Sequence, residues 1–336
     1  MNRPSPLLAK LTMLNHRRCT LCIFFTTIAF LGLTSNSRAQ PSLKKSRNSK
    51  PATTLADLSG LAWTGGDSFA AVHDAKVEDE LFKPRVANLQ LPASLRGITF
   101  TDQRTTFRGR TPNDLESIAR IPGSNNILLV ESGDSKSDPA IQRIFKASVQ
   151  KNRVRITSQT TWPVNILNVE GTAVAKLNDR YFFVFAERAD NQPSTELSWI
   201  EFDPKKMRFK KKVSKVTFDS PDPQRFNRVI VGLDIDSNGF IYSVSAFDAE
   251  AAGLPNPDNG PFAAGVYLIG QIKLQNGKAS IELFPQPVEY ALLDGFKVES
   301  VAVRESNEDE PPQLFIGTDD ENYGGTLRQL PLPILH

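Results

Sequence analysis

Cysteine and histidine are scarce in this sequence, and their scarcity limits its chemistry. The 336 residues include two cysteines, Cys19 and Cys22, and both lie within the first 39 residues. The rest of the chain therefore has no disulfide, thiol nucleophile or thiolate metal site. After residue 39 the only histidines are His73 and His336, and no Gly-x-Ser-x-Gly, His-Glu-x-x-His or P-loop motif occurs there. These absences argue against zinc and copper centres and against a serine-esterase mechanism.

The chain also lacks an excess of charge of either sign. It has 40 Lys and Arg residues and 37 Asp and Glu residues. Five of the basic residues and none of the acidic ones lie in the first 39 residues, so the remainder carries a net charge of −2. With that balance we expect no general attraction to nucleic acid or to anionic lipid.

No apolar run is long enough to cross a bilayer. The longest extends over about 16 residues from Cys19, whereas a membrane-spanning helix needs ~20. Basic residues ending at Arg18 precede this run and small residues ending at Ala39 follow it, which is the order of parts in a secretory signal peptide. We predict cleavage after Ala39 and a secreted or periplasmic chain with no integral membrane segment. An uncleaved anchor is the alternative.

The predicted organisation has three parts. Residues 1–39 form the signal peptide, residues 40–53 form a polar and basic flexible linker, and residues 54–336 form one folded domain.

A short pattern recurs within the folded domain about every 60 residues. Its five copies are Leu58–Ala62, Leu115–Ala119, Val169–Ala173, Val231–Asp234 and Val298–Ala302. A turn-rich stretch and then an apolar β-type run follow each copy, and most units contain two further β-type runs. Four antiparallel strands repeated in this way are typical of a β-propeller.

We therefore predict an all-β fold, a β-propeller with five blades of four antiparallel strands, with six blades as the alternative. The last unit ends before a fourth strand, and the segment Ala52–Asp57 is expected to supply it and close the ring. A β-sandwich would also contain many short strands, but it would not explain the recurring opening pattern.

Neighbouring strands of a blade run in opposite directions. The start of each blade's first strand and the end of its second strand therefore lie on the same face of the propeller. The other face receives mainly Gly, Asn and Pro turns, so the functional site is expected on the first face. The acidic residues predicted there as metal ligands are Glu116, Glu170, Glu299 and Asp319. Crowded carboxylates need a compensating cation, and oxygen ligands suit Ca²⁺ or Mg²⁺. The alternative is a structural role, in which these acids bond backbone N–H groups of the next blade.

The same face offers candidate catalytic and substrate-binding residues. Glu131 or Glu187 is predicted to position a water molecule, and His73 is predicted as a general base or metal ligand. A structural hydrogen bond beside Asp74 is the alternative for His73. The residues predicted to hold phosphate oxygens are Arg108, Arg110, Arg188 and Arg228.

Several of these segments resemble the phytase-like family, also called "esterase-like activity of phytase". They are Leu58–Trp63, Asp114–Ala119, Leu129–Ser132, Val169–Ala173 and Phe315–Asn322, and the resemblance extends from about Leu55 to Leu330. It implies an exported phytase-like propeller with calcium-assisted phosphoester hydrolysis. The residues on the family's acidic positions are Glu116, Glu170, Glu299 and the pair Asp319–Asp320. Val231 departs from the pattern and leaves one blade without its acid.

The sequence thus predicts a divalent-metal-dependent phosphoester hydrolase, with Ca²⁺ or Mg²⁺ as cofactor and a small phosphorylated molecule or other anionic ligand as partner. Two alternatives are a non-catalytic propeller that binds a ligand or protein in the cell envelope, and a calcium-dependent lactonase. A basic run, Lys205–Lys215, is expected at the turn before a fourth strand and on that strand. It is either a solvated edge or a weak attachment to an anionic envelope.

Overall fold

The structure is a computed structural model, and the residues it describes all belong to the second of two units, Pro51–His336. The predicted signal peptide and linker lie outside the residues that it describes, and so do Arg108 and Arg110. The described residues are 55–75, 85–91, 99–102, 107, 111–133, 142–150, 153–306 and 311–331.

The second unit consists of five antiparallel sheets, and each sheet pairs its strands in chain order. Blade 1 contains β1 (Gly60–Gly65), β2 (Ser68–Val72), β3 (Val86–Gln90) and β4 (Thr99–Asp102). Blade 2 contains β5 (Leu115–Arg120), β6 (Asn126–Glu131), β7 (Arg143–Gln150) and β8 (Arg153–Thr161). Blade 3 contains β9 (Val169–Leu177), β10 (Arg180–Glu187), β11 (Ser194–Asp203) and β12 (Arg208–Asp219). Blade 4 contains β13 (Arg228–Ile235), β14 (Phe240–Phe247), β15 (Ala263–Gln275) and β16 (Lys278–Asp294). Blade 5 contains β17 (Val298–Arg304), β18 (Gln313–Thr318) and β19 (Leu327–Gln329).

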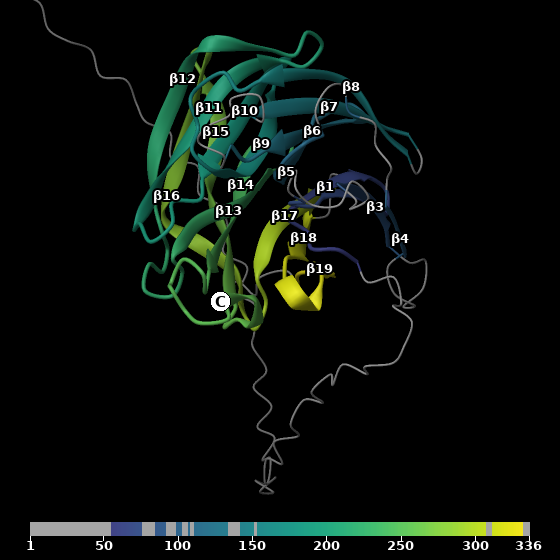
Figure 1. The fold of residues 1–336 in the computed structure, drawn as a ribbon. Helices are drawn as coiled ribbons and strands as arrows, with labels where there is room; N and C mark the ends of the chain where they lie inside the picture. The colour runs from purple at the N-terminus through teal and green to yellow at the C-terminus, as the bar shows by residue number, and fades with distance from the viewer. Residues whose placement is uncertain are drawn as a thin grey trace, which may run out of the picture. The chain divides into compact units, whose positions relative to one another are not determined.

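The first strand of each blade lies innermost, and each inner strand contacts the inner strands of the blades on both sides. Contacts between β17 and β1 close the ring (Figure 1). The protein is therefore a five-bladed β-propeller, as the repeat predicts. The described residues contain no α-helix, and their two short 3₁₀ helices are η2 (Pro257–Asn259) and η3 (Glu321–Tyr323).

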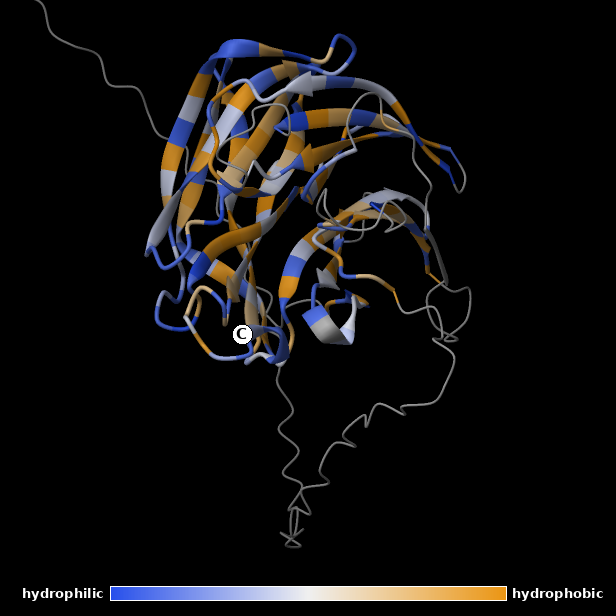
Figure 2. Ribbon diagram, in the orientation of Figure 1, coloured by the Kyte–Doolittle hydropathy of each residue, from blue (hydrophilic) through white to orange (hydrophobic). Residues whose placement is uncertain are grey.

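Burial explains why inner and outer strands differ in sequence. All eight residues of β13 are buried, because this strand lies between the neighbouring inner strands. The outermost strand β12 consists of exposed and partly buried residues except for the buried Phe218, and Figure 2 shows polar and apolar residues mixed along it. Five apolar clusters fill the spaces between neighbouring blades. The cluster between blades 5 and 1 includes the ring contact of Phe315 with Phe69, at 4.7 Å between centroids.

The junction between the last and first blades differs in part from the prediction. Leu55–Leu58 is not a strand, although two backbone hydrogen bonds tie it to blade 5. Leu58 N–H donates to Thr318 O at 2.9 Å, and Gly325 N–H donates to Leu55 O at 3.0 Å. The buried Leu58 side chain packs in the cluster between the two blades. This segment thus joins blade 5 to blade 1 through the packing of Leu58 and these two backbone hydrogen bonds. Within the described residues it does not add a fourth strand to blade 5.

Candidate functional site

The starts of the inner strands and the ends of the second strands meet on one face, which we call the mouth. Backbone hydrogen bonds join the end of one blade's second strand to the start of the next blade at four junctions. They are Leu58 N to Thr318 O, Asp114 N to Ala75 O, Val169 N to Ser132 O and Val229 N to Arg188 O. These bonds hold the repeated acidic positions of neighbouring blades close together, as the predicted strand directions require.

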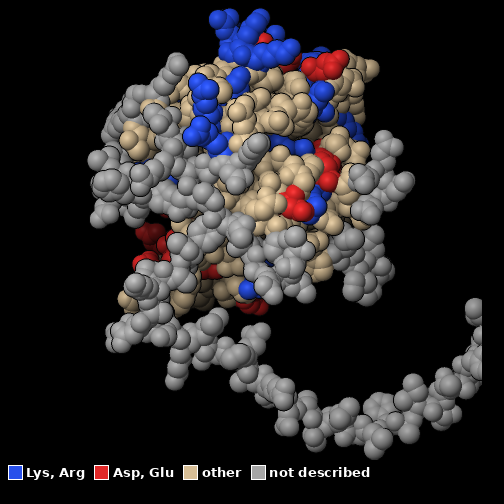
Figure 3. Space-filling view, turned by 90° about the vertical axis from the view of Figure 1, so that its right-hand side faces the viewer, with Lys and Arg blue, Asp and Glu red and all other residues tan. Residues whose placement is uncertain are grey.

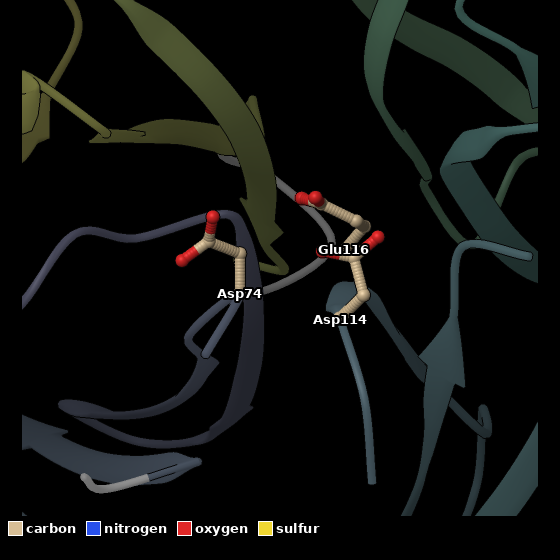
Figure 4. Close-up of side chains that lie close together, drawn as sticks. All are labelled: Asp74, Asp114 and Glu116. Atoms are coloured by element: carbon tan, nitrogen blue, oxygen red, sulfur yellow. The ribbon is translucent and has the colours of Figure 1, made fainter. Parts of the chain in front are cut away.

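Three carboxylates converge at the junction of blades 1 and 2. Asp74 follows β2, whereas Asp114 and Glu116 lie at the start of β5. One carboxylate oxygen of each lies within 4.8 Å of the other two (Figure 4). We call this group the Asp74 cluster.

Asp114 is held in an unusual backbone conformation. Its φ of 60° lies in the left-handed region, which Asp tolerates better than most residues do. Its N–H donates to Ala75 O at 3.3 Å, and its C=O accepts from Ser132 N at 3.0 Å. The Ser132 hydroxyl donates to Asp114 Oδ2 at 2.5 Å. These contacts fix the direction of the buried carboxylate, and such strained positions often occur at functional sites.

The spacing of the Asp74 cluster fits a calcium ion. Oxygen ligands lie about 2.4 Å from Ca²⁺, so two oxygens on one ion are at most about 4.8 Å apart. The all-oxygen donor set therefore suits a hard divalent cation such as Ca²⁺ or Mg²⁺.

The mouth residues of blades 3 to 5 form a different arrangement, in which acids alternate with bases. Arg188 contacts Glu170 at 2.8 Å and Asp190 at 2.9 Å. Arg228 contacts Asp190 at 3.3 Å. We call the connected set the charge arc; its acids are Glu170, Asp190, Asp248, Glu299, Asp319 and Glu321, and its bases are Arg188, Arg228 and Lys297.

Lys297 and Arg228 neutralise the acids of blades 4 and 5. Arg228 contacts Asp248, and it contacts Glu299 at 3.3 Å. Lys297 contacts Glu299 at 3.1 Å and Asp319 at 3.3 Å. Burial acts to raise the pKa of Glu299, but Lys297 and Arg228 bring it below its usual value. Burial and the nearby Glu299 charge raise the pKa of Asp319 well above its usual range, so these two acids do not ionise with equal ease.

Glu170 and Arg188 connect the arc to the Asp74 cluster. Burial raises the pKa of Glu170, although Arg228 and Arg188 oppose this shift. Burial acts to lower the pKa of Arg188, but Glu170, Asp190 and Glu116 raise it overall. Glu116 of the Asp74 cluster thus interacts electrostatically with Arg188. Arg188 is 23% exposed, so solvent still reaches it.

The centre of the ring is nearly filled. A cavity of about 10 Å³ lies among residues from all five inner strands, and Glu170 and Glu299 line it. This volume is about the space of one water molecule. A ligand larger than water therefore does not fit within the channel.

The four predicted metal ligands thus fall into two environments. Glu116 lies with Asp74 and Asp114, two residues that the prediction did not include as ligands. Glu170, Glu299 and Asp319 contact basic side chains of the charge arc. The predicted phosphate ligands Arg188 and Arg228 contact Glu170 and Glu299, and Lys297 contacts Glu299 and Asp319.

Glu131, a predicted catalytic residue, lies in a buried ion pair. Its two carboxylate oxygens accept hydrogen bonds from Arg143 Nε at 2.9 Å and Nη2 at 2.7 Å. They also accept backbone N–H bonds from Asn113 at 3.0 Å and Arg143 at 2.8 Å. Burial raises the pKa of Glu131, and the bonds from Arg143 oppose the shift. With an exposed fraction of 0%, Glu131 links the ends of β6 and β7 and does not reach solvent.

The other two predicted catalytic residues contact backbone groups. Glu187 Oε1 accepts a hydrogen bond from Leu167 N at 2.9 Å, and the Glu187 side chain is partly exposed. His73 is buried, and its Nδ1 lies 2.6 Å from Asp57 O. This contact attaches His73 to the segment that closes the ring.

Asp57 is a residue that sequence reasoning missed as a candidate. Burial and the charges of Glu321, Asp74 and Glu299 raise its pKa to about 7. Asp57 lies immediately before the first repeat copy, outside every motif, so no local pattern marks it. Asp74 and Asp114 had weak signals, since Asp74 follows His73 and Asp114 opens a segment of the phytase-like resemblance.

Comparison with known proteins identifies no family. No protein-family model and no curated protein sequence matches the chain. Similar solved structures include a GH32 beta-fructofuranosidase from Bombyx mori (12% identity, TM-score 0.47, 82% of this chain and 60% of that one). Another is an exo-1,5-alpha-L-arabinanase from a bovine ruminal metagenomic library (10% identity, TM-score 0.42, 84% and 96%). A third is a GH43 alpha-L-arabinofuranosidase from Clostridium thermocellum (10% identity, TM-score 0.44, 82% and 89%).

These similarities carry no argument about activity. The chain spans about 60% of the length of the Bombyx mori protein. The phytase-like resemblance stays a prediction, because no family model matches the chain. Among the described residues, no helix has the length and apolar character needed to span a membrane.

Proposed function

We propose that this propeller is a calcium-dependent phosphoester hydrolase whose cation binds at Asp74, Asp114 and Glu116. The observation that carries the proposal is the convergence of three carboxylate oxygens within 4.8 Å of one another at the mouth. Such a purely oxygen donor set suits a hard divalent cation. The phytase-like resemblance of the segments around Glu116 agrees with this assignment.

The surrounding residues support binding of an anionic substrate. A bound divalent cation would neutralise phosphate oxygens and acidify a water molecule. Arg188 would orient the phosphate from the blade 3 side, because Glu170 and Asp190 already hold its guanidinium in place. Arg108 and Arg110 are proposed as further phosphate ligands on the basis of the sequence alone. The predicted export would expose the site to extracellular calcium, for which weak sites of 10⁻⁴–10⁻³ M are usual.

A second candidate is a non-catalytic propeller that binds its ligand at the same mouth. The observation that favours it is the neutralisation of Glu170, Glu299 and Asp319 by basic residues. Glu131, which was predicted to position water, is committed to Arg143. In this alternative the cation would hold the ligand without turnover.

Thermal melts in EDTA and with added Ca²⁺ or Mg²⁺ test the cation site. A ligand at 100 times its Kd stabilises the native state by about 2.7 kcal/mol. For a domain of this size that corresponds to a rise in Tm of roughly 5 °C. We expect Ca²⁺ to produce such a rise in the wild type and to produce none in Asp114→Asn or Glu116→Gln. Glu250→Gln is the matched control, because it removes one exposed carboxylate on the loop after β14 and should retain the rise.

Turnover of a phosphomonoester panel under the same conditions separates the two candidates. Calcium-dependent turnover that Asp114→Asn abolishes supports the hydrolase. A calcium-induced rise in Tm without turnover supports the binding propeller. If neither Ca²⁺ nor Mg²⁺ changes the Tm of the wild type, the cation site is wrong and both candidates lose their basis.

A further inference from the structure

A second hollow lies at the end of the propeller opposite to the mouth. It is a groove of about 700 Å³ between blades 2 and 3. The turn between β5 and β6 and a residue of β7 form its blade 2 side. The β9–β10 turn, the end of β11 and the start of β12 form its blade 3 side. Its volume is that of a ligand pocket and not of a packing defect.

Basic side chains outnumber acidic ones in this groove. The basic residues are Lys146, Lys176, Arg180, Lys205 and Lys210, and the acidic ones are Asp179, Glu201 and Asp203. Two of the acids already have partners. Arg180 contacts Glu201 at 2.6 Å, and the Asp203 carboxylate accepts the backbone N–H of Lys205 at 2.9 Å. After the Arg180–Glu201 ion pair is set aside, four lysines remain against Asp179 and Asp203.

The lysines approach the groove from both blades. Lys146 Nζ, from blade 2, donates to Pro204 O of blade 3 at 2.9 Å. Lys176 Nζ, from blade 3, lies 5.9 Å from the centroid of the Tyr181 ring and approaches the turn at Gly123 of blade 2. Among the described residues, no carboxylate forms an ion pair within 4.0 Å with the Nζ of Lys176, Lys205 or Lys210. Positive charge from two blades thus converges on the groove and exceeds the negative charge there.

The basic surface continues beyond the groove along β12. In Figure 1 the first residues of β12 lie at the top of the propeller, and Figure 3 shows Lys and Arg side chains gathered at that end. The exposed basic residues there that do not line the groove are Lys206, Arg208, Lys211 and Lys212. A ligand that used both parts would be longer than the groove and would carry several negative charges.

Protection of a sheet edge does not explain this arrangement. Lysines on an outermost strand prevent pairing with other sheets, which accounts for Lys211 and Lys212 on β12. Lys146 and Lys176 lie on β7 and β9, which are not outer edges of their blades. Their orientation toward the same groove as Lys205 and Lys210 needs another reason.

We infer that this groove binds a linear polyanion with repeated phosphate or sulfate groups, which the lysines of blades 2 and 3 contact from both sides. Ammonium groups serve as point charges for such oxyanions. The concave shape favours a chain that lies within the groove over a flat anionic membrane. This site is separate from the Asp74 cluster and does not depend on calcium or on turnover.

Two charge-matched triple variants test the inference. The groove variant is Lys176→Gln, Lys205→Gln and Lys210→Gln; the control is Lys206→Gln, Lys211→Gln and Lys212→Gln, which removes the same charge from neighbouring positions. Fluorescence anisotropy with a labelled short polyphosphate chain measures the Kd at low and at physiological ionic strength. We expect the groove variant to weaken binding about tenfold and the control about twofold. The Tm of each variant checks that the fold is retained.

Three outcomes would overturn the inference. Equal weakening in both triple variants would show that net charge alone attracts the polyanion. Binding to vesicles containing anionic lipid without binding to polyphosphate would assign the basic surface to a membrane. Failure of the wild type to bind polyphosphate or a sulfated polysaccharide, even at low ionic strength, would show that the groove is not a polyanion site. Should the groove variant fail to fold, Lys176→Gln alone is expected to weaken binding by about twofold to threefold, and Lys211→Gln not at all.

Discussion

The two sides of the mouth place similar acidic positions in different surroundings. On the side of blades 1 and 2, Asp74, Asp114 and Glu116 lie with their carboxylates together. On the side of blades 3 to 5, Glu170 and Glu299 lie among Arg188, Arg228 and Lys297. Glu116, Glu170 and Glu299 occupy equivalent positions in three repeats, so their local sequence does not explain the difference.

The side chains that surround each acid explain the difference between the two sides of the mouth. Arg188 and Lys297 come from segments next to the inner strands of the charge arc, and their side chains turn toward the axis to contact buried carboxylates. A buried charge without a partner costs several kcal/mol, so we expect these contacts to stabilise the folded protein. The comparison shows that acids at equivalent positions of the repeat have different neighbours in different blades.

The largest effect is expected from breaking the charge arc. Arg228→Met removes a buried guanidinium that contacts Asp190, Asp248 and Glu299. Leaving those acids without compensation should lower the free energy of unfolding by about 3–5 kcal/mol. Urea denaturation measures this loss.

Arg225→Met is the control for that variant. Arg225 contacts Asp294, whose side chain is 81% exposed, so its loss should cost no more than about 1 kcal/mol. Equal losses in the two variants would mean that the arc contributes no more than a surface ion pair.

A smaller and more selective effect is expected from Glu170→Gln. It removes one partner of Arg188, which retains Asp190, so we expect a loss of about 1–2 kcal/mol. The rise in Tm with Ca²⁺ should persist, because the Asp74 cluster is unchanged. Melts of Glu170→Gln and Asp114→Asn with and without Ca²⁺ make this comparison. If Glu170→Gln abolishes the rise, the cation binds across both sides of the mouth.

The pH dependence of stability tests the segment that joins the two sides. Asp57 has a pKa of about 7 in the folded protein, against 3.8 for an ordinary Asp. The folded state therefore holds this proton more tightly, and the free energy of unfolding should fall as pH rises from about 4 to 7. Asp57→Asn should reduce that slope. In EDTA, the change in the free energy of unfolding caused by this substitution should be more favourable at pH 8 than at pH 4 by about 2 kcal/mol. Urea denaturation at several pH values measures both, and an unchanged slope would contradict the pKa of Asp57.

The fold could be predicted because its signals are local and repeated. Each opening pattern, turn and apolar run predicts one hairpin, and five copies predict five blades. Strand direction follows from that pairing, so the face that carries the mouth could also be predicted. The closing segment could not, since Leu55–Leu58 reaches blade 5 through two hydrogen bonds and the packing of Leu58.

The site could be predicted only as a collection of residues on one face. Glu131 at the end of β6 and Glu187 at the end of β10 occupy similar positions in the repeat, yet Arg143 forms its ion pair with Glu131. Asp114 joins Glu116 because a left-handed backbone and Ser132 direct its side chain. Neither contact leaves a sequence signal, because both depend on residues from separate strands.

The amino-acid sequence alone was sufficient for the number of blades, their strand order and the face on which the acids gather, since hairpins and repeats are short-range features. Tertiary structure decided which acids gather in the Asp74 cluster and which form the ion pairs of the charge arc. It also decided that lysines of two blades share one groove. Electrostatic energies depend on distances of a few ångströms and on burial, and these are set only when separate blades pack around one axis.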